Sequence, residues 1–156
     1  MPTEIILIII LSLVILGIVG FASMHQKKKS EEIKQNSIEL LKSYGEFSHE
    51  HKKNLFKING KTYQVLFFYV ATNADLTINS RSIWEIRDGT KPNLVDQTHF
   101  LKSEYPKIVI VYPTTVKIKR YLNENELEFV SYNKFFYEMY VVRHFELIEL
   151  LKEDVL

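Results

Sequence analysis

Residues 5–22 read IILIIILSLVILGIVGFA, and this stretch decides how the chain is organised. Only Ser12, Gly17 and Gly20 interrupt its bulky aliphatic character. At about 1.5 Å per helical residue it spans roughly 27 Å, close to the thickness of a bilayer's hydrocarbon core. A core helix of a small domain would carry a polar face, and this stretch has none. The sequence therefore predicts a transmembrane helix at 5–22, preceded by a short N-terminal tail at 1–4.

A cleaved signal peptide is the competing interpretation, because Gly20, Phe21 and Ala22 resemble a small-x-small cleavage site. Signal peptides, however, carry positive charge before a shorter apolar region. Here Glu4 is the only charged side chain that precedes the apolar stretch. We therefore expect an uncleaved anchor, with the lipid bilayer as the partner of residues 5–22.

Basic residues follow the apolar stretch instead of preceding it. Lys27, Lys28 and Lys29 lie in a juxtamembrane segment at 23–30. Lysines that flank a transmembrane helix remain on the cytoplasmic side. The sequence thus predicts a single-pass protein of the cell membrane, with its N-terminus outside and a cytoplasmic domain at 31–156.

The composition limits what this domain can do. The chain has 156 residues, with 20 Lys and Arg against 19 Asp and Glu, so its net charge is close to zero. A near-neutral protein has no general attraction for nucleic acid. The absence of cysteine excludes disulfides and thiolate metal sites. Residues 31–156 are enough for one modest hydrophobic core.

Local patterns predict an α+β domain, a mixed β-sheet flanked by helices. Ser30, followed by two glutamates, is typical of a helix N-cap, and apolar residues continue at helical spacing to Phe47. Asn59 and Gly60 predict a hairpin turn before an apolar run at 63–70, which is typical of a strand buried on both faces.

The remaining elements follow from turn and breaker residues. Asn93 is expected to cap a helix that Pro106 stops. Residues 135–142 fit either a strand or a helix. The other expected elements are a hairpin of strands 75–78 and 83–87, a loop at 88–93, a helix at 94–105, strands at 107–112, 116–121 and 127–132, and a closing helix at 146–152.

One local pattern is compatible with metal chemistry. Asp75 begins a predicted strand, and Glu85 and Arg87 share one face of its hairpin partner, because side chains alternate along a strand. Two carboxylates on adjacent strands can share Mg²⁺, which can activate water for attack on a phosphodiester. The competing interpretation is an ordinary, half-solvated hairpin rich in charged residues.

This pattern resembles the Asp…Glu-x-Lys motif of the restriction-endonuclease-like superfamily, whose core is a helix, a three-stranded meander, a helix and a further strand. The resemblance implies that Asp75, Glu85 and the main-chain carbonyl of Ile86 bind the metal. It also matches Gln97 to a glutamine that some members carry. Arg87 stands in place of the family lysine, and arginine cannot accept a proton from water. The resemblance therefore implies either a Mg²⁺-dependent nuclease or a nucleic-acid-binding derivative without catalysis.

Basic residues further along the chain allow two interpretations. Lys117, Lys119 and Arg120, with Lys107 nearby, could line a phosphate-binding groove in which Tyr121 stacks on a base. They could equally protect a solvated strand edge. Whether the domain is an enzyme therefore stays open. The favoured expectation is a protein-binding or accessory module of a membrane complex, and nucleic acid is the less favoured partner.

Overall fold

The computed structural model describes residues 3–153 and 155–156, and the chain divides into two compact units at 1–32 and 33–156. The first unit consists of one helix, α1 (Thr3–Tyr44), which continues into the second unit. Its apolar part is long and apolar enough to cross a membrane. The predicted helix start at Ser30 is wrong. No proline or glycine occurs between residues 21 and 44, so nothing breaks the helical hydrogen bonding at Ser30.

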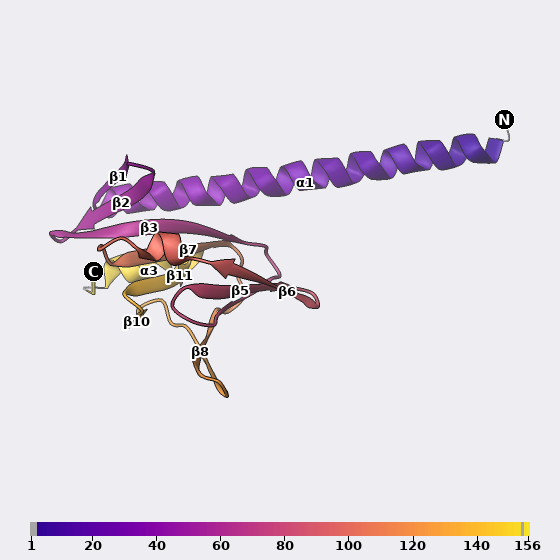
Figure 1. The fold of residues 1–156 in the computed structure, drawn as a ribbon. Helices are drawn as coiled ribbons and strands as arrows, with labels where there is room; N and C mark the ends of the chain where they lie inside the picture. The colour runs from indigo at the N-terminus through magenta and orange to yellow at the C-terminus, as the bar shows by residue number, and fades with distance from the viewer. Residues whose placement is uncertain (1–2, 154) are drawn as a thin grey trace. The chain divides into compact units, whose positions relative to one another are not determined.

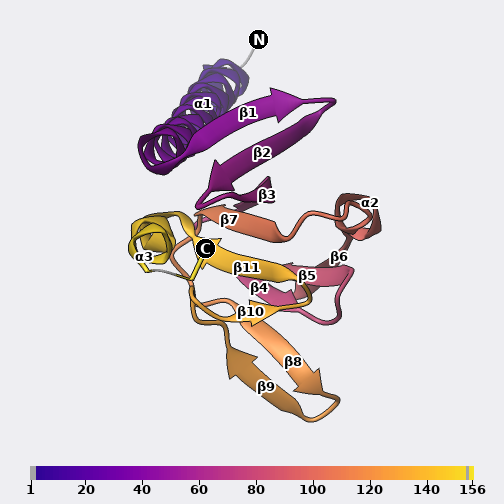
Figure 2. The ribbon, with the colours of Figure 1, turned by 90° about the vertical axis from the view of Figure 1, so that its left-hand side faces the viewer.

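The second unit contains a six-stranded mixed sheet (Figures 1 and 2). In sheet order its strands are β1 (Glu46–Glu50), β2 (Lys53–Ile58), β3 (Lys61–Val70), β7 (Lys107–Pro113), β11 (Met139–Arg143) and β10 (Phe135–Phe136). Strands β1, β2 and β3 form an antiparallel meander, β3, β7 and β11 are parallel, and β10 pairs antiparallel with β11.

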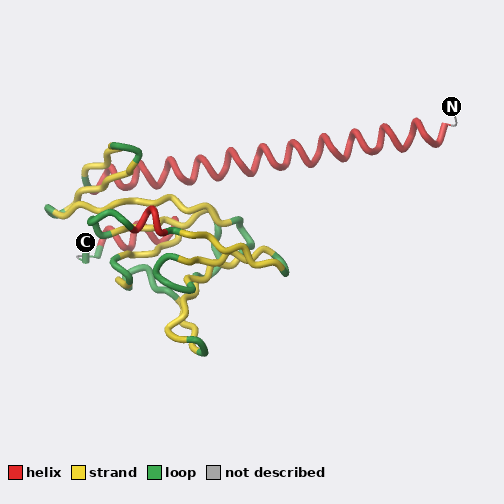
Figure 3. Tube along the Cα trace, viewed as in Figure 1, coloured by secondary structure: helices red, strands yellow, loops and turns green. Residues whose placement is uncertain are grey.

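A second sheet of five strands lies against the first, and apart from α1 the helices of this unit are short (Figure 3). In sheet order its strands are β6 (Lys91–Asp96), β5 (Ile83–Asp88), β4 (Asp75–Ile78), β8 (Lys119–Asn123) and β9 (Glu126–Phe129). Strands β4 and β8 are parallel, and the other neighbours are antiparallel. The short helices are α2 (Thr98–Leu101), the 3-10 turn η1 (His144–Glu146) and α3 (Leu147–Lys152).

Two hydrophobic cores lie on opposite faces of the six-stranded sheet. Alternate residues of β7 show this division, because Ile108 and Ile110 belong to one core while Val109 and Val111 belong to the other. The first core also contains Leu41 of α1 and the leucines of α3, and the second core contains the inward side chains of the five-stranded sheet. The strands predicted at 63–70 and 107–112 are confirmed, and burial on both faces explains their continuous apolar sequences.

The α+β class is confirmed, with two mixed sheets in place of the single sheet expected. Both predicted hairpins are present as β2–β3 and β4–β5. Asn59 and Gly60 have positive φ angles of 51° and 79°, as a tight hairpin turn requires. The predicted closing helix is present as α3, and the open segment 135–142 forms the β10–β11 hairpin.

The helix predicted at 94–105 is wrong. Residues 91–96 form β6 along β5, with Val95 packed against the second core. The helical turn begins only at Thr98, whose backbone N–H donates to the Asp96 carboxylate at 2.7 Å, so Asn93 does not cap it. Strand pairing therefore outweighs the local capping signal.

Three further strand boundaries differ from the predictions. β1 occupies residues that were expected to end the first helix, because α1 stops at Tyr44 before Gly45. The strand expected at 116–121 begins at Lys119 and joins β4, and the strand expected at 127–132 ends at Phe129.

Candidate functional site

The five-stranded sheet has one face toward the core and one face toward solvent. Leu76, Ile78 and Trp84 are buried in the second core. Strand register places the alternate residues on the opposite side, since Asp75 pairs with Arg87 and Thr77 pairs with both Glu85 and Lys119. We call this solvent side the outer face; it comprises Asp75, Thr77, Glu85, Arg87, Leu94, Lys119, Tyr121, Leu127 and Phe129.

The centre of the outer face holds two ion pairs. Lys119 Nζ lies 3.4 Å from Asp75 Oδ2, and Arg87 Nη2 lies 2.7 Å from Glu85 Oε1. The second oxygen of Glu85 accepts a hydrogen bond of 3.4 Å from the Asn79 amide. The structure thus brings the predicted Asp75, Glu85 and Arg87 to one face and adds Lys119 beside them. Each acid has a basic partner, so the centre is close to neutral.

Exposed apolar side chains flank this neutral centre on both sides. Leu94 is paired with Glu85 across β5 and β6, and its exposed fraction is 61%. On the other flank, Phe129 is paired with Lys119 and is 59% exposed, while Leu127 is paired with Tyr121 and is 50% exposed. No catalytic or binding motif in the sequence includes these apolar residues. The sequence signal for Leu127 and Phe129 is the alternation of charged and apolar residues in 126–129. Because side chains alternate along a strand, it places both residues on the face of β9 opposite to that of Glu128.

The basic residues predicted to bind phosphate do not form one patch. Lys119 is paired with Asp75, and Lys117 Nζ lies 5.0 Å from the centre of the Phe129 ring. Arg120 points to the other side of β8, where it bonds to Glu128 and lies 4.4 Å from the Phe136 ring.

Glu128 and the buried Lys107 further reduce the positive charge that this part of the protein offers at its surface. Glu128 also accepts hydrogen bonds of 2.7 Å from Lys134, and the bonds from Lys134 and Arg120 hold the pKa of this carboxyl below its ordinary value. Lys107 is only 1% exposed, and its ammonium donates to the carbonyls of Ser103 and Tyr105 at 2.8 and 2.6 Å. Burial lowers the pKa of Lys107. A lysine held in this way fixes the loop before β7 and is not available to a phosphate at the surface.

The outer face is a poor fit for Mg²⁺ as its side chains stand. Within residues 3–153 and 155–156, no group of three or more His, Asp or Glu side chains is arranged to hold a metal. Asp75 and Glu85 lie on one face, but a cation would have to displace Lys119 and Arg87 from them. Gln97 lies at the start of α2, beyond the end of β6. The nuclease interpretation therefore stays a prediction.

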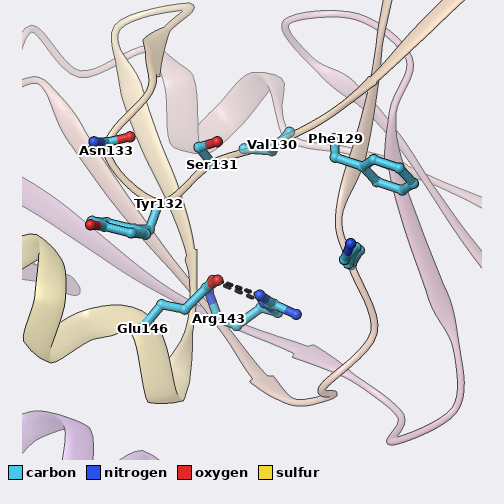
Figure 4. A pocket seen from close by; sticks show the side chains of 8 residues that line it. Phe129, Val130, Ser131, Tyr132, Asn133, Arg143 and Glu146 are labelled. Atoms are coloured by element: carbon cyan, nitrogen blue, oxygen red, sulfur yellow. Dashed lines mark hydrogen bonds and ion pairs between the residues drawn. The ribbon is translucent and has the colours of Figure 1, made fainter.

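A cavity of about 430 Å³ borders the outer face at Phe129 (Figure 4). Arg143 and Glu146 lie on one side of it and residues 129–133 on the other (Figure 4). The Arg143 guanidinium donates to Glu146 and, at 2.9 Å, to the Thr115 carbonyl. The bond to the Glu146 carboxylate raises the pKa of Arg143, and both bonds use the charge of the guanidinium within the protein. The cavity therefore offers a ligand little uncompensated charge beyond Lys117.

Comparison with protein-family models, with curated proteins and with solved structures finds no match to this chain.

Proposed function

We propose that this chain is a single-pass membrane protein whose cytoplasmic domain binds a partner protein through the outer face. The observation that carries the proposal is the pair of apolar margins, Leu94 on one side and Leu127 with Phe129 on the other, around a centre of paired charges. Protein interfaces combine apolar and aromatic anchors with polar groups in this way. The partner would offer apolar pockets to the margins and complementary charges to the centre.

The charge balance favours a protein over a nucleic acid. The centre of the outer face has two acids and two bases, and each base is already paired. Binding to a phosphate backbone depends on several basic groups that can release counterions, which this face does not supply. Exposed aromatic and aliphatic side chains instead lose water-accessible area most readily against another protein surface.

Membrane anchoring is supported by the apolar part of α1 and by the lysines at 27–29 that follow it. We expect the full chain to remain in the membrane fraction after high-salt and carbonate washes. Protease added to intact cells should leave the domain whole and should digest it after lysis. A soluble product shortened near Ala22 would contradict the anchor, and digestion in intact cells would reverse the topology.

Site-specific photo-crosslinking in cells that express the full chain tests the outer face. A photoreactive amino acid at Leu94 or Tyr121 should give an adduct of one discrete mass. The same group at Tyr44 or Val155 serves as the matched control, because both residues are exposed but lie outside the face. Phe129→Glu should abolish the adduct from Tyr121, since it buries a charge in the apolar margin.

Three outcomes would contradict the partner proposal. Equal adducts from the control positions would indicate non-specific contact. An adduct of twice the mass of the chain would show self-association. A nuclease-sensitive adduct would favour the alternative, a nucleic-acid-binding or nuclease-like domain. That alternative is supported by the arrangement of Asp75 and Glu85 on one face of adjacent strands.

A further inference from the structure

The helix α1 continues without a break beyond its apolar part, so each juxtamembrane residue has a fixed direction around the helix. At 3.6 residues per turn, His25, Lys28 and Lys29 lie on one side, in line with Phe21 one turn earlier. The Phe21 and His25 rings are nearly parallel, at 13°, with centroids 6.5 Å apart. Lys27 lies on roughly the opposite side of the helix. The three consecutive lysines are therefore not equivalent.

The side that carries His25, Lys28 and Lys29 also forms a hollow. Together with Glu32, these residues line a space of about 370 Å³. All four are exposed, and neither Lys28 nor Lys29 makes an ion pair within the part of the chain that the structure describes. Two unpaired ammonium groups against one carboxylate, which lies a turn further from the apolar segment, leave a positive site nearer that segment.

The depth of this site matches lipid headgroups. The apolar stretch ends at Ala22, and a rise of about 1.5 Å per residue places His25 to Lys29 roughly 5 to 10 Å beyond it. The headgroup layer extends about 5 to 7 Å outside the hydrocarbon core, and long lysine side chains can reach back into it. Anionic headgroups attract basic residues at this position.

We propose that the face formed by His25, Lys28 and Lys29 binds the phosphate of an anionic phospholipid. The proposal rests on the membrane anchoring proposed above and goes beyond it, because it assigns a lipid site to one side of the helix. Lys28 and Lys29 bind the phosphate. The His25 ring lies beside Phe21 and borders the site on the side of the apolar segment. Lys27 contributes to topology but not to this site.

Lipid retention by the full chain tests the proposal. The full chain is reconstituted in nanodiscs that contain equal amounts of phosphatidylglycerol and phosphatidylcholine. After release from the nanodiscs, native mass spectrometry measures the mass of the protein together with the lipids that it retains. We expect retained phosphatidylglycerol to exceed phosphatidylcholine. Lys28→Gln and Lys29→Gln should each lower its retention about fivefold, the effect of about 1 kcal/mol per lysine. Lys27→Gln is the matched control, since it removes the same charge from the other side, and should leave retention nearly unchanged.

Each result that would contradict the lipid site leads to a different conclusion. Equal losses from the three substitutions would show diffuse attraction to a charged surface and would overturn the site. Equal retention of both lipids would overturn it as well. Displacement of phosphatidylglycerol by inorganic phosphate at low concentration would identify soluble phosphate, and not lipid, as the ligand. If the chain fails to remain in membranes, the anchor itself has failed; if it remains but shows no lipid preference, only the lipid site has failed.

Discussion

Trp84 of the five-stranded sheet and Phe68 of the six-stranded sheet meet edge to face, with ring centroids 5.1 Å apart and ring planes at 78°. Trp84 is fully buried, and its indole N–H donates to the Arg81 carbonyl at 3.3 Å. Edge-to-face pairs contribute about 0.5–1.5 kcal/mol beyond the burial of their surface. This contact joins the two sheets and so supports the hairpin that carries Asp75 and Glu85.

Removal of the Phe68 ring should weaken the whole second core. We expect Phe68→Ala to lower the free energy of unfolding by about 3–5 kcal/mol, the usual cost of deleting a buried aromatic ring. This loss is measured by unfolding the full chain with denaturant in detergent and monitoring the fluorescence of Trp84. Phe135→Ala is the control, because Phe135 is 50% exposed, and it should cost much less. Equal costs would mean that Phe68 does not hold the sheets together.

Gly45 permits the close approach of the end of α1 to β2. A Cβ atom at this position would clash with the carbonyl oxygen of Lys57 and would lie 2.9 Å from Cε2 of Phe56, which is fully buried. Because a backbone atom and a core ring must both move, Gly45→Ala should destabilise the domain by about 1–3 kcal/mol. Gly17→Ala should leave the unfolding of the domain unchanged, since nothing lies within 4 Å of that position. A stable Gly45→Ala variant would show that β1 and β2 can shift freely.

Features fixed by neighbouring residues could be predicted from the sequence. The turn at Asn59 and Gly60 is one, because both residues tolerate the positive φ angles of a tight hairpin. The placement of Glu85 and Arg87 on one side of a strand is another, because side-chain alternation is a local property.

Features set by distant partners could not be predicted in this way. Residues 91–96 carry a helix capping signal, yet β5 supplies a strand partner and the second core buries Val95. Lys119 meets Asp75 only because β8 runs parallel to β4, which no local pattern indicates. The outer face is therefore visible as a face only once both strand pairings are known.

The His144 side chain should make stability depend on pH. Burial lowers the pKa of His144, the nearby Arg143 lowers it further, and a hydrogen bond with the Val111 backbone partly offsets these effects. The Nδ1 atom of the His144 ring is buried and has no hydrogen-bond partner within residues 3–153 and 155–156. Since the folded pKa lies below the ordinary value of 6.5, the unfolded chain binds the proton more readily. The contribution of His144 to the free energy of unfolding is therefore fully present above pH 6.5, and it is lost as the pH falls below that value.

The melting temperature of the full chain, measured from neutral to mildly acidic pH, checks this effect. His144→Gln should reduce the fall in melting temperature just below pH 6.5. It should not change the further fall at lower pH, which comes from the protonation of carboxylates. His99→Gln is the control. An unchanged profile in the His144 variant would show that the histidine does not titrate differently in the folded protein.

Metal titration separates the protein-binding proposal from the nuclease-like alternative. The ion pairs that Asp75 and Glu85 already make, with Lys119 and Arg87, oppose a cation at this face. We therefore expect Mg²⁺ and Mn²⁺ to leave the melting temperature of the full chain unchanged, because a ligand stabilises a protein only when it binds the folded state. Asp75→Asn should then be equally indifferent to metal. A rise in melting temperature with metal that Asp75→Asn abolishes would contradict this expectation and would revive the nuclease-like interpretation. In that event Arg87→Lys, which restores the lysine of the family pattern, should raise metal-dependent cleavage of DNA, and Lys91→Arg on the neighbouring strand should not.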